Sequence, residues 1–417
     1  MRPKSDILVV GGGIIGVSVA VQLQIRGVKV ALVDWERPGA GTSYGNAGLI
    51  QDEAIMPYLF PRSFGELFRY ARNRSIDASY DLAALPRLSV PFFRYWRNSR
   101  ADRALAIARH RAPLISRSIA DHLELANMAG AAELLRPTGW SKLFYSQRRL
   151  DQAVEEAEAQ SRELGVSYVA MDGAGVAGQE PDLSSMVAGG LHWPSPLSVS
   201  DPYALTKAYL DLFLGLGGVL HKGDAQLLES VSDGWQMPTE QGLAAARRVV
   251  ISLGPWSPIL YEKFGYSLPF FVMRGYHRHY GVRGGARLNR PVLDAENGYF
   301  LVPMRQGIRL TTGAEFARRN APPNPVQLER ALPKARQLFP ALGDALESEP
   351  WVGARPCMPD MLPVIGPAPR HPGMWFALGH GHHGLTMGPT TGKLMADLIT
   401  GAVPFTDPAP YRADRFQ

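Results

Sequence analysis

The first 34 residues constrain the possible folds of this chain more than any other stretch. An apolar run at 6–10 leads directly into the sequence Gly11-Gly12-Gly13-Ile14-Ile15-Gly16. A stretch of helical character at 17–26 follows, and a second apolar run at 28–33 ends in Asp34. This order of strand, glycine-rich turn, helix, strand and acid is the fingerprint of a dinucleotide-binding βαβ unit. We therefore expect an α/β fold with a Rossmann-like parallel sheet.

Each part of the fingerprint has a separate physical role. Gly11 allows a tight turn, Gly13 lets the backbone approach a pyrophosphate, and Gly16 lets the helix pack closely on the sheet. The helix N-terminus offers free N–H groups and the positive end of its dipole to phosphates. The carboxylate of Asp34 suits the hydroxyls of an adenosine ribose and disfavours the 2′-phosphate of NADP. The predicted contacts from this unit are Gly11, Gly13, Ile14, Ile15, Gly16 and Asp34.

Two features favour FAD over NAD as the dinucleotide. The fingerprint lies at the N-terminal end of the chain, which is common where FAD binds across a discontinuous domain. The glycine-rich, polar segment 39–48 would let backbone donors approach a flat ring system, although an ordinary surface loop is the alternative. The predicted FAD contacts from this segment are Thr42, Ser43, Gly45, Asn46 and Gly48.

Two remote segments have the pattern of further strands of the same sheet. One is an apolar strand at 246–253, and the other is a strand at 374–378 with a glycine- and histidine-rich loop and a helix ending near Gly401. A helix that begins beside a flavin can stabilise negative charge on the reduced ring. The three histidines at 380–383 lack metal-ligand spacing, so we predict no metal site. The predicted FAD contacts from the remote segments are Gly254, Trp256, Gly381, His383, Gly384, Leu385 and Thr386.

These segments together resemble the D-amino acid oxidase/dehydrogenase superfamily of FAD-dependent oxidoreductases. The resemblance is strongest to bacterial D-amino acid dehydrogenases of the small-subunit type, including D-hydroxyproline dehydrogenases. It runs from the fingerprint to the terminal glycine/histidine loop, and its most specific part is the segment 353–360 combined with that loop. The resemblance implies a glutathione-reductase-like architecture, with a discontinuous FAD-binding domain and a substrate domain on a mixed β-sheet.

The resemblance also implies the domain boundaries. The FAD-binding domain is expected at 1–55, 100–130, 155–262 and 350–417. The substrate domain is expected at 56–99, 131–154 and 263–349. Strand-like segments at 140–145, 274–282 and 299–312 would supply its sheet.

The same resemblance assigns the catalytic positions. Arg355 falls where relatives hold the substrate carboxylate, and a guanidinium suits that planar, two-pronged contact. Tyr276 and Tyr299 match strands that face the flavin, with core packing as the alternative for each. Cys357 is out of register with the cysteine that carries covalent flavin in some relatives, so non-covalent FAD is expected. The implied reaction is hydride transfer from Cα of a small D-amino acid, or of a cyclic D-imino acid such as a D-hydroxyproline, to the flavin.

The positive charge of the chain is concentrated in one window. The chain has a net charge of +6, whereas residues 55–117 contain twelve arginines, four acids and no lysine, together with many aromatic residues. This window is either a solvated helical face or a contact with a membrane or a protein partner, and nucleic acid ranks last. The family resemblance favours a peripheral membrane contact and a quinone or respiratory electron acceptor.

Other features indicate where the protein acts. A single cysteine fits a reducing compartment, and we see neither a signal peptide nor a spanning apolar run. A cytoplasmic location is expected, or one on the cytoplasmic face of the inner membrane. Two alternative functions remain: a glycine/sarcosine-type amine oxidase that uses oxygen, and a flavin-bearing subunit of a multi-subunit dehydrogenase.

Overall fold

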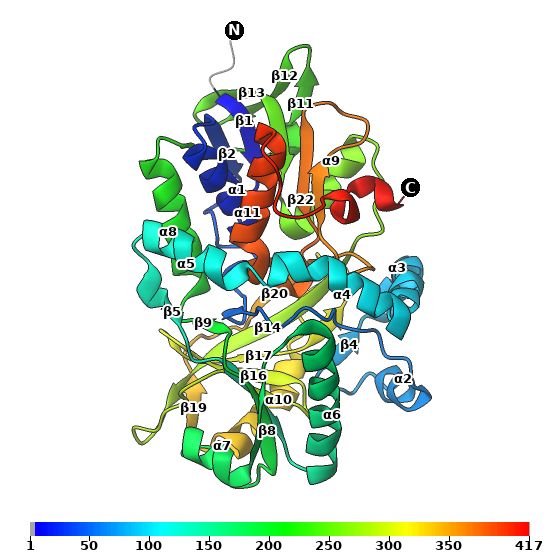
Figure 1. Cartoon of the computed structure of the whole chain (residues 1–417), viewed down its shortest axis with the longest axis vertical. Coiled ribbons are helices and arrows are strands. Elements are labelled where there is room, and N and C mark those ends of the chain that lie inside the picture. Colours follow the sequence, from blue (N-terminus) through cyan, green and yellow to red (C-terminus); the bar gives the residue numbers. More distant parts are fainter. Residues whose placement is uncertain (1–4, 417) are drawn as a thin grey trace.

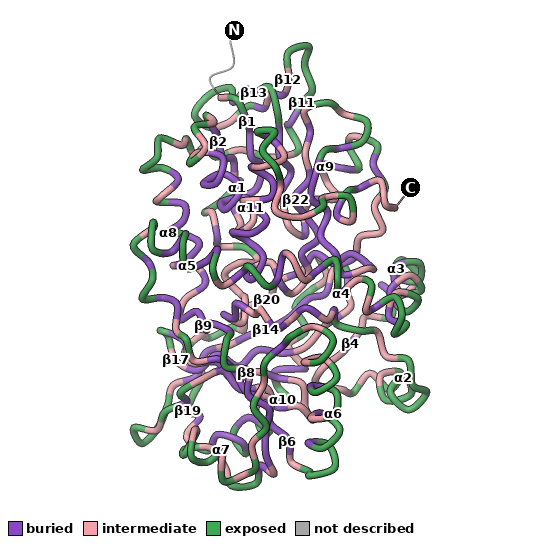
Figure 2. Tube along the Cα trace, viewed as in Figure 1, coloured by how far each residue is buried: buried purple, intermediate pink, exposed green. Residues whose placement is uncertain are grey.

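The chain is built on two large β-sheets that lie one above the other along the long axis of the molecule (Figure 1). A computed structural model describes residues 5–416. The first and last long elements, strand β1 (Ser5–Val10) and helix α11 (Gly384–Thr400), lie in the same lobe. Figure 2 shows that buried residues follow the strands of both sheets and the helices beside them.

The first sheet contains the dinucleotide fingerprint. Its parallel part has the order β10-β2-β1-β13-β22, and β11, β12 and β21 add antiparallel strands. The remaining strands of this sheet are β2 (Val30–Asp34), β10 (Val219–Lys222), β11 (Glu229–Val231), β12 (Gly234–Thr239), β13 (Gly242–Ile251), β21 (Val364–Pro367) and β22 (Met374–Leu378). The predicted α/β fold with a Rossmann-like sheet is confirmed.

Both faces of the central strands are covered, which explains why β1 and β2 read as continuous apolar runs. Alternate residues of β1 point to opposite sides: Ile7 and Val9 belong to one apolar cluster, and Leu8 and Val10 belong to another. The first cluster includes side chains from α1 (Ile14–Ile25), α4 (Ala101–Ile115), α5 (Ser118–Met128), α8 (Pro202–Gly215) and α11. The second cluster includes side chains from α9 (Ser257–Lys263).

The second sheet has the order β4-β18-β14-β17-β16-β15-β6-β8-β7, and β19 and β20 also pair with β14. Helix α10 (Val326–Leu338) packs on one face of this sheet. Helices α6 (Gln147–Leu164) and α7 (Gly173–Gln179) lie near β8, while α2 (Phe64–Ala71) and α3 (Leu85–Asn98) lie at the side of the molecule (Figure 1). The strands are β4 (Ala78–Tyr80), β6 (Trp140–Phe144), β7 (Val169–Asp172), β8 (Gly189–Trp193), β14 (Phe271–Val282), β15 (Val292–Asp294), β16 (Tyr299–Met304), β17 (Gly307–Thr311), β18 (Ala314–Phe316), β19 (Leu342–Ala345) and β20 (Trp351–Cys357).

The sheets divide the chain differently from two of the expected boundaries. Strands β7 and β8, expected in the FAD-binding domain as part of 155–262, pair antiparallel in the second sheet. Strand β20, expected in the same domain as part of 350–417, pairs antiparallel with β14. The amino-acid composition of a short strand does not indicate which sheet it joins. Only the strand pairing assigns β7, β8 and β20 to the second sheet. A small third sheet of β3 (Leu49–Ile50), β5 (Leu135–Arg136) and β9 (Leu197–Val199) completes the fold.

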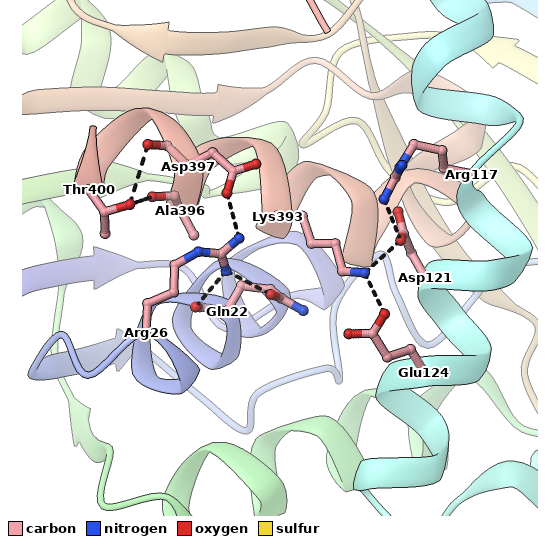
Figure 3. Close-up of polar contacts among 9 residues, drawn as sticks. All are labelled: Gln22, Arg26, Arg117, Asp121, Glu124, Lys393, Ala396, Asp397 and Thr400. Carbon is pink, nitrogen blue, oxygen red and sulfur yellow. Dashed lines mark hydrogen bonds and ion pairs between the residues drawn. The ribbon is translucent and has the colours of Figure 1, made fainter. Parts of the chain in front are cut away.

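Helix α11 is held against α1 and α5 by close packing and by charge. A Cβ atom at Gly392 of α11 would lie 2.5 Å from the carbonyl oxygen of Ser18 in α1, so the two helices meet at their backbones. Figure 3 shows the polar contacts that flank this crossing. Arg26 pairs with Asp397 at 2.6 Å, and Lys393 pairs with Asp121 at 2.8 Å.

Asp121 should be the most costly of these acids to remove. Its buried carboxylate accepts hydrogen bonds from Lys393 and from the Thr390 hydroxyl, each at 2.8 Å. Asp121→Ala would leave the largely buried Lys393 ammonium with only the exposed carboxylate of Glu124, and it would leave the Thr390 hydroxyl without its acceptor. We expect a loss of about 3–5 kcal/mol in the free energy of unfolding. Glu124→Ala removes an exposed partner of the same lysine and should cost about 0.5 kcal/mol. Urea unfolding of both variants measures the difference, and equal losses would contradict this account.

Candidate active site

One large cavity runs from the first sheet to the second. Its volume is about 1060 Å³, and its lining includes the fingerprint glycines of the first sheet and the β14 and β17 strands of the second. This exceeds the range of about 300–1,000 Å³ that single drug-sized ligands occupy. The cavity is therefore large enough for an extended ligand such as a dinucleotide.

The fingerprint forms an open helix start at one side of the cavity. Gly11 has φ +109°, and a Cβ atom there would lie 2.5 Å from the carbonyl oxygen of Ser252. A Cβ atom at Gly16 would lie 1.8 Å from the carbonyl oxygen of Gly11, so only glycine lets α1 begin this close to the strand. The first turn of α1 contains no acidic side chain, which leaves its positive end available to an anion.

Two polar side chains from elsewhere complete this part of the cavity. The Asp34 carboxylate at the end of β2 accepts hydrogen bonds from the backbone N–H groups of Gly12 at 2.5 Å and Glu36 at 3.1 Å. The Ser43 hydroxyl accepts a hydrogen bond from the Ile14 N–H at 2.9 Å. Asp34 and Ser43, both predicted to contact FAD, line the cavity.

The glycine-rich segment 42–48 is tied to the second sheet. The Thr42 hydroxyl donates to the carbonyl oxygen of Ala354 in β20 at 3.0 Å. A Cβ atom at Gly45 would overlap the Trp351 ring at 1.8 Å, so the loop passes directly against that indole. Gly48 does not line the cavity; it has φ +70°, and a Cβ atom there would lie 2.6 Å from the carbonyl oxygen of Val199. Its glycine therefore lets the backbone pass close to β9 before β3 begins.

Sequence reasoning missed Arg309, which holds this loop in place. Its buried guanidinium donates to the carbonyl oxygens of Tyr44 and Asn46, and its Nε donates to His279 at 3.0 Å. Burial lowers the pKa of Arg309 to about 10. The sequence signal that could have identified it is an arginine within the otherwise uncharged strand Gly307–Thr311.

Buried histidines hold the start of α11 and the loop before it. His122 of α5 donates from Nε2 to the carbonyl oxygen of Leu385 at 2.7 Å, because a carbonyl can only accept. Its Nδ1 therefore accepts from the Tyr209 hydroxyl at 2.9 Å. His383 does not line the cavity and instead bonds through Nδ1 to buried Arg111 at 3.1 Å. The described residues form no cluster of three or more His, Cys, Asp or Glu side chains that could hold a metal ion.

Arg355 presents an unpaired positive charge to the cavity. Gly275 on the neighbouring strand makes room for it, since a Cβ atom there would lie 2.4 Å from an Arg355 nitrogen. The guanidinium donates only to backbone carbonyl oxygens, with Gly313 at 2.8 Å the shortest, and no described carboxylate lies within 4 Å. Burial lowers the pKa of Arg355 from its ordinary value. The site therefore attracts an anion.

The predicted roles of Tyr276 and Tyr299 are not supported by their positions. Both lie in the apolar cluster under α10, on the face of the sheet away from the cavity. The Tyr276 hydroxyl donates to Glu315 at 2.7 Å and accepts from Arg274, which forms a buried ion pair with the same glutamate. Successive strand residues point to opposite faces, so the cavity is lined by the neighbours Gly275 and Phe300 instead.

Most of the other predicted contacts do line the cavity, and some do not. The lining residues are Gly11, Gly13, Ile14, Ile15, Asp34, Thr42, Ser43, Gly45, Asn46, Gly254, Trp256, Gly381, Gly384, Leu385 and Arg355. The residues outside the lining are Gly16, Gly48, His383, Thr386, Tyr276 and Tyr299. Thr386 joins the loop to β3, because its hydroxyl donates to the carbonyl oxygen of Leu49 at 3.3 Å.

Comparison with known proteins agrees with this geometry. A model of the FAD dependent oxidoreductase family (DAO) matches residues 6–398. The chain belongs to this family. Its cofactor is FAD, and the fingerprint, the Asp34 carboxylate and the open helix start fit the phosphates and ribose of that group. The fold and family together make the protein an FAD-dependent oxidoreductase.

Individual relatives resemble the whole chain. The chain is 29% identical over 430 residues to a D-amino-acid oxidase of Bradyrhizobium diazoefficiens, with 100% of both chains covered. It is 30% identical over 416 residues to a D-amino acid dehydrogenase of Methylobacterium nodulans, covering 95% of this chain and 96% of that relative. The structure of glycine oxidase from Geobacillus kaustophilus superposes with a TM-score of 0.73 at 24% identity, covering 98% of each chain. L-amino acid deaminase from Proteus vulgaris gives 0.74 at 18% identity, covering 100% of this chain and 98% of that one.

The buried His122 predicts a loss of stability in acid. Burial lowers its pKa from 6.5 to about 4, so the folded state favours the neutral ring. The stabilisation is complete above pH 6.5 and is lost as the pH falls toward 4, by about 3 kcal/mol. In His122→Gln, the free energy of unfolding should depend less steeply on pH in this window. Urea unfolding at several pH values tests this, and parallel slopes for both proteins would contradict it.

Proposed function

We propose that this enzyme oxidises the Cα–N bond of a D-amino acid, with FAD held non-covalently. The observation that carries the proposal is Arg355, a cavity-lining cation with no described carboxylate partner. The hydride would pass from Cα to FAD and leave an imino acid, which water hydrolyses to an oxo acid and ammonia. The D configuration is supported by the names of the relatives at 29–30% identity.

Arg355 would bind and orient the substrate. A guanidinium forms two parallel hydrogen bonds to a carboxylate, which fixes the position of Cα. Burial and the positive charge of Arg355 disfavour an ammonium group nearby, so the substrate amine would lose its extra proton on binding. The cofactor supplies the hydride acceptor. No strong protein base is required.

Non-covalent binding is supported by the state of Cys357. This residue is fully buried and does not line the cavity. Burial raises the pKa of its thiol to about 12, so the reactive thiolate form is suppressed.

The alternative functions fit the cavity less well. A flavin-bearing subunit without a substrate has no use for an unpaired cation that lines the cavity, where a structural arginine such as Arg309 does not lie. A glycine or sarcosine oxidase would also need a cation to bind the substrate carboxylate, so Arg355 does not distinguish it from the proposed function. The two functions differ in the electron acceptor and in the substrate side chain.

Replacing Arg355 should slow amine oxidation strongly without removing the cofactor. We expect Arg355→Ala to lower the second-order rate of flavin reduction by amino acids at least 100-fold, because a charge-assisted, two-pronged contact is lost. Arg355→Lys should retain part of the rate, since the charge remains but the fork does not. Anaerobic bleaching of flavin absorbance measures both. Dithionite should still reduce each variant, and wild-type rates in Arg355→Ala would refute the role.

A membrane-associated electron acceptor, such as a quinone, is the second part of the proposal. Within residues 5–416 no helix is long and apolar enough to cross a membrane. Helix α2 nevertheless exposes Phe64 at 93% and Phe68 at 70%, while its residues Leu67 and Tyr70 line the cavity. The exposed arginines nearby include Arg72, Arg74, Arg87 and Arg97. An apolar, basic surface on a cavity wall suits anionic lipid and a lipid-soluble acceptor.

The acceptor proposal predicts a specific defect. Phe64→Ser/Phe68→Ser should bind anionic lipid vesicles at least 10-fold more weakly and should transfer electrons to a quinone in those vesicles more slowly. Flavin reduction by substrate in solution should be unchanged. The control is Val403→Ser, since Val403 is also 93% exposed but lies after α11. Sedimentation with vesicles and quinone absorbance report the two effects. Equal behaviour of wild type and double variant would contradict the proposal.

A further inference from the structure

The part of the cavity beside Arg355 has an aromatic wall. Met273 is the strand partner of Arg355, and both line the cavity. Tyr58 also lines the cavity, with its ring 4.8 Å from that of His382, and its carbonyl oxygen accepts from the Tyr95 hydroxyl at 2.9 Å. Because all of these residues line the cavity, the wall begins at the cation itself.

The wall continues through a set of packed rings. The Tyr95 and Phe60 rings lie 5.5 Å apart, and the Phe60 and Phe92 rings lie 5.6 Å apart. The Phe92 and Phe316 rings meet edge to face at 4.9 Å. Phe60, Phe92, Tyr95 and Phe316 all line the cavity. A side chain that extends from the carboxylate site along this wall would meet aromatic carbon.

Among the described residues, this wall offers no charged group that could pair with a charged substrate side chain. Asp77 is the carboxylate that lines the cavity nearby, and it is already bonded to Arg69 at 2.8 Å and to the Tyr70 hydroxyl at 2.7 Å. His382 also lines the cavity, and burial, together with the charges of Arg355 and Arg111, lowers its pKa well below the ordinary value. Its ring is therefore neutral at pH 7. Among the described residues on this wall, Arg355 is the one unpaired charge, and the substrate carboxylate would occupy it.

We infer that the enzyme selects amino acids with large apolar side chains, and that Phe92 helps to determine this specificity. The inference rests on the proposed function, because it places the substrate carboxylate on Arg355. A large apolar side chain gains contact with the rings of the wall. A charged side chain would lose water without gaining a partner, which is costly. Small side chains would leave the wall unfilled.

The test uses the FAD-loaded enzyme and a panel of substrates. Anaerobic flavin reduction is measured with both enantiomers of phenylalanine, leucine, methionine, alanine, aspartate, lysine and proline. We expect second-order rates about 100-fold higher for phenylalanine, leucine and methionine than for alanine, and lower still for aspartate and lysine. Fastest reduction by alanine, proline or a charged amino acid would overturn the inference and leave the proposed function intact. A flavin that dithionite reduces but no amino acid reduces would overturn the proposed function and, with it, the inference.

Two neighbouring phenylalanines give a matched pair of variants. Phe92 lines the cavity, whereas Phe93 on the next position of α3 is 60% exposed and does not. Phe92→Ala should lower the phenylalanine-to-alanine rate ratio at least 10-fold, and Phe92→Leu should restore most of it. Phe93→Ala should leave the ratio within about twofold of wild type. A folding defect alone would reduce the rates for both substrates equally. An unchanged ratio in Phe92→Ala, or an equal change in Phe93→Ala, would refute the assignment.

Discussion

The guanidinium of Arg355, which lines the cavity and has no carboxylate partner, organises the functional half of this molecule. Arg355 is held by backbone carbonyl oxygens, which satisfy its N–H donors but do not neutralise its charge. The space for it exists because β14 has glycine at position 275 opposite β20. The buried residues Arg111 and Arg309 are also bonded to backbone carbonyl oxygens and to no described carboxylate, but neither lines the cavity. Arg355 does line it, so an anionic ligand in the cavity can reach its charge and stabilise it.

The two sheets meet where this charge and the cofactor site come together. The segment 42–48 leaves the first sheet, bonds to β20 through Thr42, and is held from the second sheet by Arg309. The start of α11 is held by His122 of α5, which donates a hydrogen bond to the Leu385 carbonyl oxygen. Thr42, Arg309 and His122 therefore hold the backbone segments that bound the cavity. A site that must position Cα against a flat ring requires such fixed walls.

Local patterns in the sequence predict the first sheet well. The fingerprint, the strand at 246–253 and the terminal loop each combine a buried apolar run with glycine, and the structure places all of them around one cavity. Tyr276 and Tyr299 could not be assigned in this way, because the face of a strand depends on register, and a shift of one residue reverses it. The membership of β7, β8 and β20 in the second sheet depends on long-range pairing in the same way.

The arginine- and aromatic-rich window shows a different limit of sequence reasoning. Its composition does not distinguish residues that face solvent from residues that face the cavity, and the structure contains both kinds on adjacent positions, as at Phe92 and Phe93. Several of its aromatic residues therefore form a wall of the active-site cavity, while Phe64 and Phe68 lie outside. Only the three-dimensional arrangement separates a pocket lining from an external surface.

The most direct test of the account removes the charge from the substrate and leaves the enzyme unchanged. The FAD-loaded enzyme is mixed rapidly, without oxygen, with D-phenylalanine or with D-phenylalaninamide. These two ligands differ only in that the amide lacks the carboxylate. If Arg355 positions Cα through that carboxylate, the acid should bleach the flavin at least 100-fold faster than the amide. Equal rates for the two would show that the unpaired guanidinium does not hold the substrate.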